Sequence, residues 1–596
     1  MQTMLEIKLS KNALKVLEAR YLKRDAERRI IETPEELFHL VAGCIAQGEA
    51  MWVSPQQIDH WRREYLELMT SLDFLPNSPT LMNAGKPLGQ LSACFVLPVE
   101  DSMEGIFEAV KQMALVQRTG GGTGFSFSRL RPKGDLVAST SGEASGPVSF
   151  MKIFDCATEN IKQGGKRRGA NMGVLRVDHP DIMEFITAKL DGVTLQNFNI
   201  SVGATDTFMK ALEQDSDYEL IHPRTGKCVG RLRANAVFDT IVHAAWRTGD
   251  PGLLFLDTIN RSNPTPRVGE IEATNPCGEI PLLPYESCNL GSINLSRMIH
   301  ERQGHPSVDW QKLRATVRKA IRFLDDVIEA GRYPIPEIER MTKSNRKVGL
   351  GLMGFAELLI RLGVSYASPE AVTVAENIMR FIDEESLAIS QELAAERGVF
   401  PNWKGSVYED RGIQLRNATR TAIAPTGTIS IIAGTSAGIE PLFALAYKRS
   451  HVLDGQTLYE LNPLLLEYLA RYGLDTNKII PEILERGGLK DVDGIPGEIK
   501  RLFVTSLEIP FEQHLRIQAA FQRHVDNSVS KTINLPHDTA PSLVAEAYRQ
   551  AWEMGLKGIT IYRYGSKQTQ VLELGVGEEA LHYDHASRCD PEECKV

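Results

Sequence analysis

The chain has 596 residues, and its 42% apolar and 24% charged residues are typical of an ordinary globular protein. The formal net charge of −9 argues against a broad surface for nucleic acid or an anionic membrane. No apolar run reaches the roughly 18 residues of a transmembrane helix, and the first residues lack a signal-peptide pattern. We therefore expect a cytoplasmic protein with no nucleic acid and no membrane among its partners.

Residues 1–75 are predicted to form an N-terminal helical region. Apolar residues recur at helical spacing from Ala13 to Tyr21. The segment 33–36, Thr-Pro-Glu-Glu, combines an N-cap candidate, a proline at the first position and acidic residues in the first turn. The proline-containing stretch 74–79 ends this region.

Residues 76–570 are predicted to form one catalytic domain, because this stretch contains no long linker, charge block or low-complexity segment. Short apolar runs alternate with helical stretches. The predicted strands are 94–97 and 125–127, and the predicted helices are 101–116, 148–160, 313–330, 372–395 and 515–524. This alternation favours an α/β fold with mostly parallel strands, whose loops and strand ends carry the catalytic residues. Residues 571–596 are mostly polar and are expected to form a flexible tail.

The segment Asn275-Pro276-Cys277-Gly278-Glu279 is the strongest candidate for chemistry. Its proline and glycine predict a tight loop that exposes Cys277 at the tip. Glu279 is then a candidate general base, and Asn275 a hydrogen-bond donor that orients the reacting groups. The alternative is a turn around a buried thiol, since free cysteine is among the most buried residue types.

Cys94 and Cys288 are a candidate dithiol, although they are far apart in the sequence. Only the fold can bring them together, and a disulfide needs their Cα atoms within about 7 Å. Three separated thiols beside a carboxylate and an amide favour chemistry that takes two electrons from a dithiol. A metal site has its thiols in close pairs, so we predict no metal. Two unrelated buried cysteines are the alternative.

Cys589 and Cys594 form a second pair, in the polar C-terminal tail. Two cysteines in a flexible segment with no core to bury them suit thiol–disulfide exchange. The alternative is half of a zinc site together with His582 and His585, but no second cysteine pair lies nearby.

Two loops are candidate anion sites. Residues 425–430, Pro-Thr-Gly-Thr-Ile-Ser, have hydroxyls and free N–H groups at a predicted helix start, and this combination suits a phosphate. The alternative is an ordinary helix N-cap, which has the same sequence pattern. Residues 163–169, Gln-Gly-Gly-Lys-Arg-Arg-Gly, can bind a nucleotide phosphate or form a solvated surface loop. The 163–169 loop does not fit the Walker A pattern, and the glycine-rich turn 119–124 does not fit the Rossmann pattern. The Gly-x-Ser-x-Gly at 434–438 lacks the following helix that a nucleophile elbow needs.

In their order along the chain, these motifs resemble the large catalytic chain of ribonucleotide reductases over nearly the whole sequence. The matching segments are 76–85, 92–95, 119–124, 164–169, 275–279, 288–291 and 425–430. The resemblance implies a ten-stranded α/β barrel built from two parallel five-stranded halves, with the thiyl cysteine on a loop inside the barrel.

The C-terminal motif indicates the class within this family. Residues 561–566, Ile-Tyr-Arg-Tyr-Gly-Ser, and the Cys-Asp-Pro of the tail are similar to the adenosylcobalamin-dependent class. The two-subunit aerobic class has adjacent tyrosines here, and the glycyl-radical class has an Arg-Val-x-Gly-Tyr stretch; this chain has neither. The resemblance implies adenosylcobalamin as the cofactor. The runner-up is the catalytic subunit of a two-component reductase that needs a separate radical subunit.

The resemblance also implies a role for each candidate residue. Cys277 would form the thiyl radical that abstracts the ribose 3′-hydrogen. Glu279 would take the 3′-hydroxyl proton, and Asn275 would hydrogen-bond the ribose hydroxyls. Cys94 and Cys288 would supply protons and electrons and end as a disulfide. The tail pair, Cys589 and Cys594, would re-reduce that disulfide and be reduced in turn by thioredoxin or a similar protein.

Two sets of nucleotide contacts follow from the resemblance. The substrate contacts would be Ser78, Ala93, Cys94, Gly122, Asn275, Pro276, Cys277, Gly278, Glu279, Pro425, Thr426, Gly427, Thr428 and Ile429. The contacts of a (d)NTP effector that sets base specificity would be Asp101, Arg131, Lys133, Lys166, Arg167 and Arg168. Because the family's effector site lies at a dimer interface, we expect a homodimer. Because the predicted helical region begins near residue 1, we expect no N-terminal ATP-binding cone of the kind that many relatives carry.

The expected reaction is the reduction of ribonucleoside diphosphates to 2′-deoxyribonucleoside diphosphates for DNA synthesis, since the family's dimeric members favour diphosphates. A catalytically silent nucleotide-binding homologue is an alternative from a different functional class. All three of Cys94, Cys277 and Cys288 are present, which favours an active enzyme.

Overall fold

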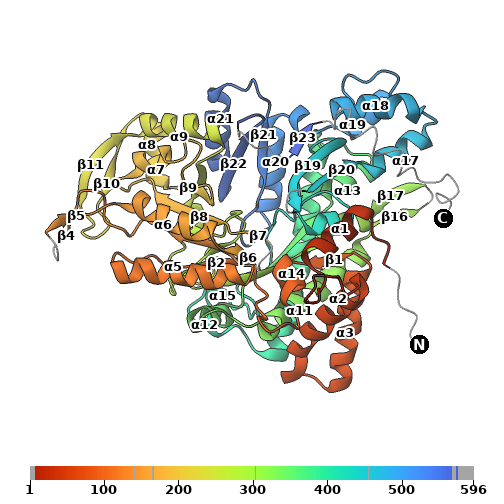
Figure 1. The fold of residues 1–596 in the computed structure, drawn as a ribbon, viewed down its shortest axis with the longest axis horizontal. Coiled ribbons are helices and arrows are strands. Elements are labelled where there is room, and N and C mark those ends of the chain that lie inside the picture. The colour runs from red at the N-terminus through yellow and green to blue at the C-terminus, as the bar shows by residue number, and fades with distance from the viewer. Residues whose placement is uncertain are drawn as a thin grey trace.

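The computed structural model describes residues 7–137, 141–163, 167–302, 304–453, 456–566 and 572–574. The N-terminal region is helical, as predicted, with helices α1 (Lys11–Arg20), α2 (Pro34–Ala46) and α3 (Pro55–Thr70). Thr33 and Glu36 form a reciprocal capping box that starts α2 at the predicted proline. Figure 1 shows α2 and α3, coloured red, beside the long helix α11 (Trp310–Ala330).

The first half of the central sheet is parallel. Its strands, in spatial order, are β2 (Cys94–Val96), β3 (Gly122–Ser126), β8 (Asn171–Arg176), β9 (Phe198–Ala204) and β12 (Gly252–Phe255). Between them in the chain lie the helices α5 (Met103–Arg118), α6 (Pro147–Glu159), α7 (Ile182–Thr187), α8 (Asp206–Glu213) and α9 (Ala234–Thr248). Alternating strands and helices of this kind produce parallel neighbours, as the sequence pattern predicts.

The second half is also parallel and completes the barrel. Its members are β15 (Ser287–Asn294), β18 (Val348–Met353), the extended segment 419–424, residues 528–535 with β21 (Thr532–Leu535), and β22 (Gly558–Arg563). Leu350 pairs with Thr421, and Ile423 with Val529, so the extended segment joins β18 to the strand that ends in β21. The two halves meet antiparallel at β2–β15 and at β12–β22. The prediction of a ten-stranded α/β barrel with two parallel five-stranded halves is confirmed.

The remaining elements surround the barrel. A short strand β1 (Phe74–Pro76) pairs antiparallel with β15, and α4 (Ser78–Asn83) follows it. The peripheral hairpins are β4 (Leu136–Val137) with β5 (Gly142–Glu143), β6 (Lys162–Gln163) with β7 (Arg167–Arg168), β10 (Asp217–Ile221) with β11 (Cys228–Arg233), β16 (Ile299–Arg302) with β17 (His305–Val308), and β19 (Ala446–Leu453) with β20 (Gln456–Leu461) and β23 (Leu572–Leu574). The other helices of four or more residues are η1 (Gln47–Met51), α10 (Leu256–Arg261), α12 (Pro336–Asn345), α13 (Phe355–Arg361), α14 (Pro369–Arg397), α15 (Val407–Asp410), α16 (Ile429–Ala433), α17 (Pro463–Arg471), α18 (Thr476–Arg486), α19 (Gly497–Leu502), α20 (Phe511–Gln522) and α21 (Pro541–Glu553).

The helices predicted from apolar periodicity are confirmed with small shifts at their ends: 101–116 is α5, 148–160 is α6, 313–330 is α11, 372–395 is α14 and 515–524 is α20. No helix in the described ranges is long and apolar enough to cross a membrane. The division into regions 1–75, 76–570 and 571–596 stays a prediction, and residues 575–596, with Cys589 and Cys594, lie outside the described residues.

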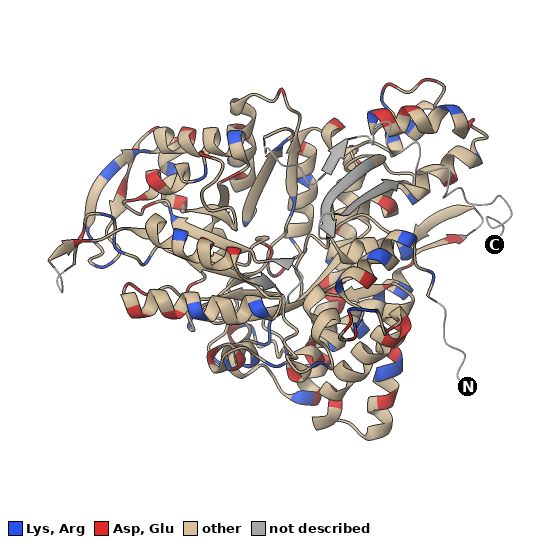
Figure 2. Cartoon of the chain, viewed as in Figure 1, with Lys and Arg blue, Asp and Glu red and all other residues tan. Residues whose placement is uncertain are grey.

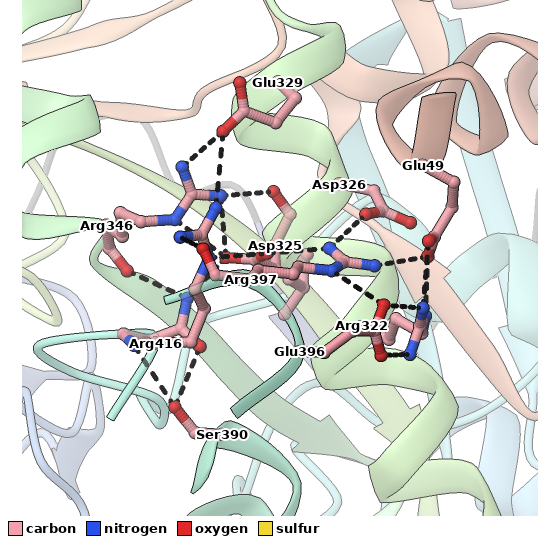
Figure 3. A network of polar contacts seen from close by, with 12 residues as sticks. Glu49, Arg322, Asp325, Asp326, Glu329, Arg346, Ser390, Glu396, Arg397 and Arg416 are labelled. Carbon is pink, nitrogen blue, oxygen red and sulfur yellow. Dashed lines mark hydrogen bonds and ion pairs between the residues drawn. The ribbon is translucent and has the colours of Figure 1, made fainter. Parts of the chain in front are cut away.

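A buried polar network joins the N-terminal helices to the barrel (Figure 3). Arg397 of α14, with no exposed side-chain surface, donates to Glu49 of η1 and to Asp325 and Asp326 of α11 at 2.6–2.9 Å. The whole network contains the carboxyl groups of Glu49, Asp325, Asp326, Glu329 and Glu396 and the guanidinium groups of Arg322, Arg346, Arg397 and Arg416.

One carboxyl group of this network is protonated, which balances its charge. Burial raises the pKa of Asp326 well above its ordinary value, and the negative charge of Glu49 acts in the same direction. The Tyr65 hydroxyl donates to the other side of the Asp326 carboxyl at 2.5 Å. Four carboxylates then face four guanidinium groups, so the network buries no net charge.

Candidate active site

The loop that contains Cys277 lies inside the barrel. It is the tip of a hairpin formed by β13 (Ala273–Thr274) and β14 (Pro281–Leu282). Asn199 of β9 donates its side-chain amide to the carbonyl oxygen of Pro276 at 2.8 Å, and the Ser528 N–H donates to the carbonyl oxygen of Glu279 at 2.9 Å. These two contacts come from opposite halves of the barrel, so the loop is held from both sides.

Glycines make room for this hairpin. A Cβ atom at Gly124 of β3 would lie 1.7 Å from the carbonyl oxygen of Thr274, and one at Gly122 would lie 3.0 Å from the ring of Pro276. Gly278 has φ +82°, a left-handed conformation that lets the loop turn at its tip. The tight loop predicted from Pro276 and Gly278 is therefore confirmed, and the Cys277 side chain is exposed.

Cys94 and Cys288 are brought together by the fold. Cys94 is the first residue of β2, Cys288 is the second residue of β15, and the two stand directly opposite each other in the antiparallel pair. Cα atoms in such pairs are about 4.5–5.5 Å apart, which is within the range of a disulfide. Both thiols are reduced and buried.

Asn275 connects this dithiol to the carboxyl group of Glu279. Its side-chain oxygen accepts the N–H of Ile280 at 3.0 Å, which fixes the orientation of the amide. The amide lies close enough to the Cys94 thiol and the Glu279 carboxyl to lower the pKa of both groups. Cys94 also lies close enough to Cys277, Cys288 and Glu279 for their charges to affect its pKa.

Burial sets the protonation of these groups. It raises the pKa of Glu279 to about 7, with the Asn275 hydrogen bond acting in the opposite direction. One carboxyl oxygen of Glu279, Oε2, is buried with no hydrogen-bond partner among the described residues. Burial also raises the pKa of Cys94, reinforced by the charge of Glu279, and the pKa of Cys288, so both thiols hold their protons at neutral pH. A carboxyl group that titrates near neutrality beside a protonated dithiol can exchange protons with a bound substrate.

A cavity of about 940 Å³ opens in front of Cys277. Its wall includes Pro276, Cys277 and Gly278 of the hairpin loop and Pro425 of the predicted phosphate loop. Volumes of 300–1,000 Å³ are typical of small-molecule sites. The structure thus brings the predicted radical loop and the predicted phosphate loop to one cavity.

The segment after the phosphate loop is held in place at three points. The Gly438 N–H donates to the Thr426 hydroxyl at 2.8 Å. The Ser436 N–H donates to Glu357 at 2.9 Å. Glu440 accepts from the Lys531 ammonium at 2.7 Å.

These contacts exclude the nucleophile elbow. The helix α16, rather than a strand, precedes the Gly-x-Ser-x-Gly motif, and the Ser436 hydroxyl bonds to the Glu357 carboxylate. Ser436 is therefore a structural residue of the cavity wall. Nothing in the local sequence links it to Glu357, which lies 79 positions earlier.

Two predicted substrate residues contact helix α1. Thr428 accepts an N–H from the Arg20 guanidinium at 2.9 Å, and the Ser78 and Tyr21 hydroxyls are 2.7 Å apart. Ala93 and Gly122 flank the dithiol: the Ala93 N–H donates to the Cys288 carbonyl, and the Gly122 N–H donates to the Ala93 carbonyl. Sequence reasoning missed Arg20, Tyr21 and Asn199.

The predicted effector residues lie apart from the cavity. Asp101 accepts from the Arg131 backbone N–H at 3.1 Å and from its guanidinium at 2.9 Å, and Lys133 donates its N–H to Asp181. Arg167 and Arg168 form β7, which pairs with β6. Lys166 lies outside the described residues.

Comparisons with known proteins agree with this geometry. Residues 92–562 match the family model of the ribonucleotide reductase barrel domain, and residues 7–89 match that of the ribonucleotide reductase all-alpha domain. The chain is 51% identical to a protein of Thermoplasma acidophilum named as a vitamin B12-dependent ribonucleoside-diphosphate reductase, with 96% of this chain and 81% of that protein covered. A protein of the same name from Mycobacterium tuberculosis is 50% identical, covering 97% of this chain and 81% of that protein.

The fold has a solved counterpart as well. The alpha subunit of the Actinobacillus ureae class Id ribonucleotide reductase superposes with a TM-score of 0.77 at 24% identity, covering 94% of this chain and 97% of that chain. The family models, the relatives and the shared barrel together lead to one conclusion: this chain belongs to the ribonucleotide reductase large-chain family.

Proposed function

We propose that this chain reduces ribonucleoside diphosphates to 2′-deoxyribonucleoside diphosphates by thiyl-radical chemistry that depends on adenosylcobalamin. The observation that carries the proposal is the position of Cys277 on a loop inside the barrel, beside the Cys94–Cys288 dithiol and the Glu279 carboxyl. The names of the relatives at about 50% identity support both the substrate class and the cofactor.

Each of the proposed site residues has its own role in the reaction. Cys277, the thiol on the cavity wall, gives up its hydrogen atom and then takes the 3′-hydrogen of the bound ribose. Glu279, in its ionised form, takes the proton of the 3′-hydroxyl, and Asn275 orients the ribose hydroxyls. Proton removal at the 3′ oxygen assists the departure of the 2′-hydroxyl.

The dithiol supplies the reducing equivalents. Cys94 lies close to Asn275 and Cys277 of the loop, and it donates a proton to the departing 2′-hydroxyl, which leaves as water. Cys94 and Cys288 together lose two electrons and two hydrogens and become a disulfide. Cys277 returns a hydrogen to the 3′ position, so the balance is one nucleotide and one dithiol converted to one deoxynucleotide, one disulfide and one water.

The cavity fits a cofactor that acts at Cys277. Outside the hairpin loop its wall has polar groups from Asn199, Asn534 and Tyr562 and apolar groups from Leu253 and Ile561, a mixed surface suited to a large nucleoside-bearing ligand. These are the residues that we propose hold the cofactor's adenosyl part. When bound, adenosylcobalamin supplies the carbon-centred radical that takes the hydrogen atom of the Cys277 thiol.

The remaining partners are proposed from the family resemblance. A (d)NTP effector binds near Asp101, Arg131 and Lys133, at an interface between two copies of the chain. Cys589 and Cys594 re-reduce the active-site disulfide and are themselves reduced by thioredoxin or a similar protein. Such dithiol chemistry suits the reducing conditions of the cytoplasm.

The deciding experiment is anaerobic conversion of CDP to dCDP by the purified chain alone, with dithiothreitol and an effector, with and without adenosylcobalamin. Product that forms only with the cofactor supports the proposal. Absence of product in both arms, across effectors and with CTP, would favour the alternative of a two-component reductase or a silent homologue. Product without the cofactor would overturn the cofactor assignment.

A further inference from the structure

The C-terminal end of helix α1 contacts two of the segments proposed to bind the substrate. Arg20 donates a guanidinium N–H to the Thr428 hydroxyl at 2.9 Å, across 408 residues of sequence. The next residue, Tyr21, is buried, and its hydroxyl is 2.7 Å from that of Ser78. Two consecutive residues thus contact the predicted phosphate loop, through Thr428, and a second proposed substrate residue, Ser78.

The geometry of α1 directs Arg20 into the molecule. Ala13, Val16 and Leu17 are the buried residues of this helix. Arg20 follows Val16 and Leu17 by four and three positions, so it lies on the same face. The helix packs against α16, which begins directly after Thr428, and the cavity is lined by Ser10 and Asn12 from the start of α1.

The phosphate groups of a bound nucleotide need a positive charge beside them, and the predicted phosphate loop does not supply one. A terminal phosphate carries about −1.5 to −2 charges at pH 7. The loop 425–429 and Ser78 contain no basic residue. Among the described residues that line the cavity, the one basic residue is Lys531, which is fully buried and paired with Glu440 at 2.7 Å.

We propose that Arg20 is a substrate-binding residue, whose guanidinium pairs with the terminal phosphate of the ribonucleoside diphosphate. Its planar group presents five N–H donors in a fork that matches the geometry of a phosphate. Helix α1 then forms one side of the diphosphate site, with Tyr21 holding Ser78 in place. This inference rests on the proposed function and names the phosphate-binding cation of that same site.

The test compares charge-removing variants on two faces of the same helix. Arg20→Gln removes the proposed phosphate ligand. Lys11→Gln, at an exposed position of α1, removes a positive charge without touching the cavity. Arg20→Lys keeps the charge but loses the planar donor array. Calorimetry measures CDP binding to each full-length variant in the absence of cofactor, and steady-state kinetics measures kcat and KM in its presence.

We expect Arg20→Gln to weaken CDP binding and raise KM roughly 10- to 100-fold, the value of one charge-assisted hydrogen bond, with kcat unchanged. Arg20→Lys is expected to fall between this variant and the wild type, and Lys11→Gln to match the wild type. The inhibition constant of inorganic pyrophosphate, as a competitor of CDP, should rise by a similar factor in Arg20→Gln.

Three outcomes would overturn the inference. The first is wild-type CDP affinity in both Arg20 variants. The second is an equal loss in Lys11→Gln, because it would show a general effect of charge. The third is a fall in kcat at unchanged KM. Binding of CDP by a wild-type chain that gives no product would count against the proposed function while leaving this comparison intact.

Discussion

Cys94 and Cys288 face each other across the antiparallel junction between β2 and β15, one of the two places where the halves of the barrel meet. Each cysteine belongs to a different half, and Cys94 lies close to Glu279, Cys277 and Asn275 of the loop. A disulfide here would link the two halves directly beside the loop that carries Cys277. The oxidation state of the dithiol and the geometry of the radical loop are therefore physically connected.

We expect a Cys94–Cys288 disulfide to accumulate when a chain with Cys589→Ser and Cys594→Ser turns over with cofactor and without a reductant, because the proposed tail pair can then no longer re-reduce it. The register places the two residues at a separation that a disulfide spans without backbone movement. Peptide mapping by mass spectrometry after a single turnover measures the bond. The control is Cys228, an exposed cysteine on β11, which should stay reduced. Product formation by this tail variant with both Cys94 and Cys288 still reduced would contradict the assignment of the dithiol as reductant.

Replacing Cys277 by serine should abolish turnover with little effect on folding. A serine hydroxyl does not form the corresponding radical, so we expect activity to fall by at least about 10⁴-fold, as for other essential nucleophilic groups. The side chain is exposed to the cavity, so the free energy of unfolding should change by no more than about 0.5 kcal/mol. CDP reduction and thermal denaturation check the two statements. Normal turnover by this variant would exclude Cys277 as the radical residue.

Gly124 should not tolerate alanine. The added methyl group would lie 1.7 Å from the carbonyl oxygen of Thr274, a backbone atom of the hairpin inside the barrel. We expect a loss of stability of roughly 1–3 kcal/mol and a displaced loop with strongly reduced activity. Gly43, in the helix α2 with nothing within 4 Å of its Cβ position, is the matched control. Alanine there should stabilise the chain by about 0.4–1 kcal/mol.

The buried network predicts a large effect far from the active site. Arg397→Met removes a guanidinium that donates to Glu49 and Asp325 and leaves one negative charge of the network uncompensated, so we expect a destabilisation of about 3–5 kcal/mol. The exposed pair of Arg231 and Glu219 is the control, and Arg231→Ala should cost at most about 1 kcal/mol. Chemical denaturation measures both. Equal small effects would show that solvent reaches the network. Figure 2 shows the positions of Lys, Arg, Asp and Glu interspersed along the helices, strands and loops of the whole fold.

The sequence predicts those parts of the structure that depend on local patterns. The capping box at Thr33 and Glu36, the helix α11 and the tight turn at Gly278 all follow from residues within a few positions of one another. Contacts between distant segments have no such signal. The pairing of Cys94 with Cys288 depends on strand register, and a strand's register is fixed only when the whole barrel forms.

The sequence contains a weak indication that the Arg20 side chain points into the molecule. A single arginine continues the apolar face of α1, at a position where the periodicity predicts a buried residue. Nothing in the sequence identifies Thr428 as its partner. The same holds for Asn199, whose amide reaches the Pro276 carbonyl across the barrel. The resemblance to the reductase family gives the roles of the motif residues, but not these supporting contacts.

The raised pKa of Glu279 makes activity depend on pH. Its carboxylate must be ionised to take the 3′-hydroxyl proton, and its pKa is about 7 because the group is buried. We therefore expect kcat/KM to rise about tenfold per pH unit below pH 7 and to level off above it. Glu279→Gln should lower kcat by roughly 10²–10⁴-fold and remove this limb of the profile. A wild-type profile that is flat between pH 5.5 and 8 would exclude Glu279 as the base.

The free energy of unfolding should fall as the pH rises, whereas kcat/KM should increase. The folded pKa of Glu279 is raised from 4.5 to about 7, so between these values the folded chain binds a proton that the unfolded chain has released. Its contribution to the free energy of unfolding is complete below pH 4.5 and is lost as the pH rises through 7, a difference on the order of 3 kcal/mol. The isosteric Glu279→Gln variant lacks this ionisation, so the difference in stability between wild type and variant should shift in favour of the variant from pH 5 to pH 8. A difference that is constant over this range would mean that the carboxyl group is solvated and titrates normally, which would also remove the physical basis for its role as a base at neutral pH.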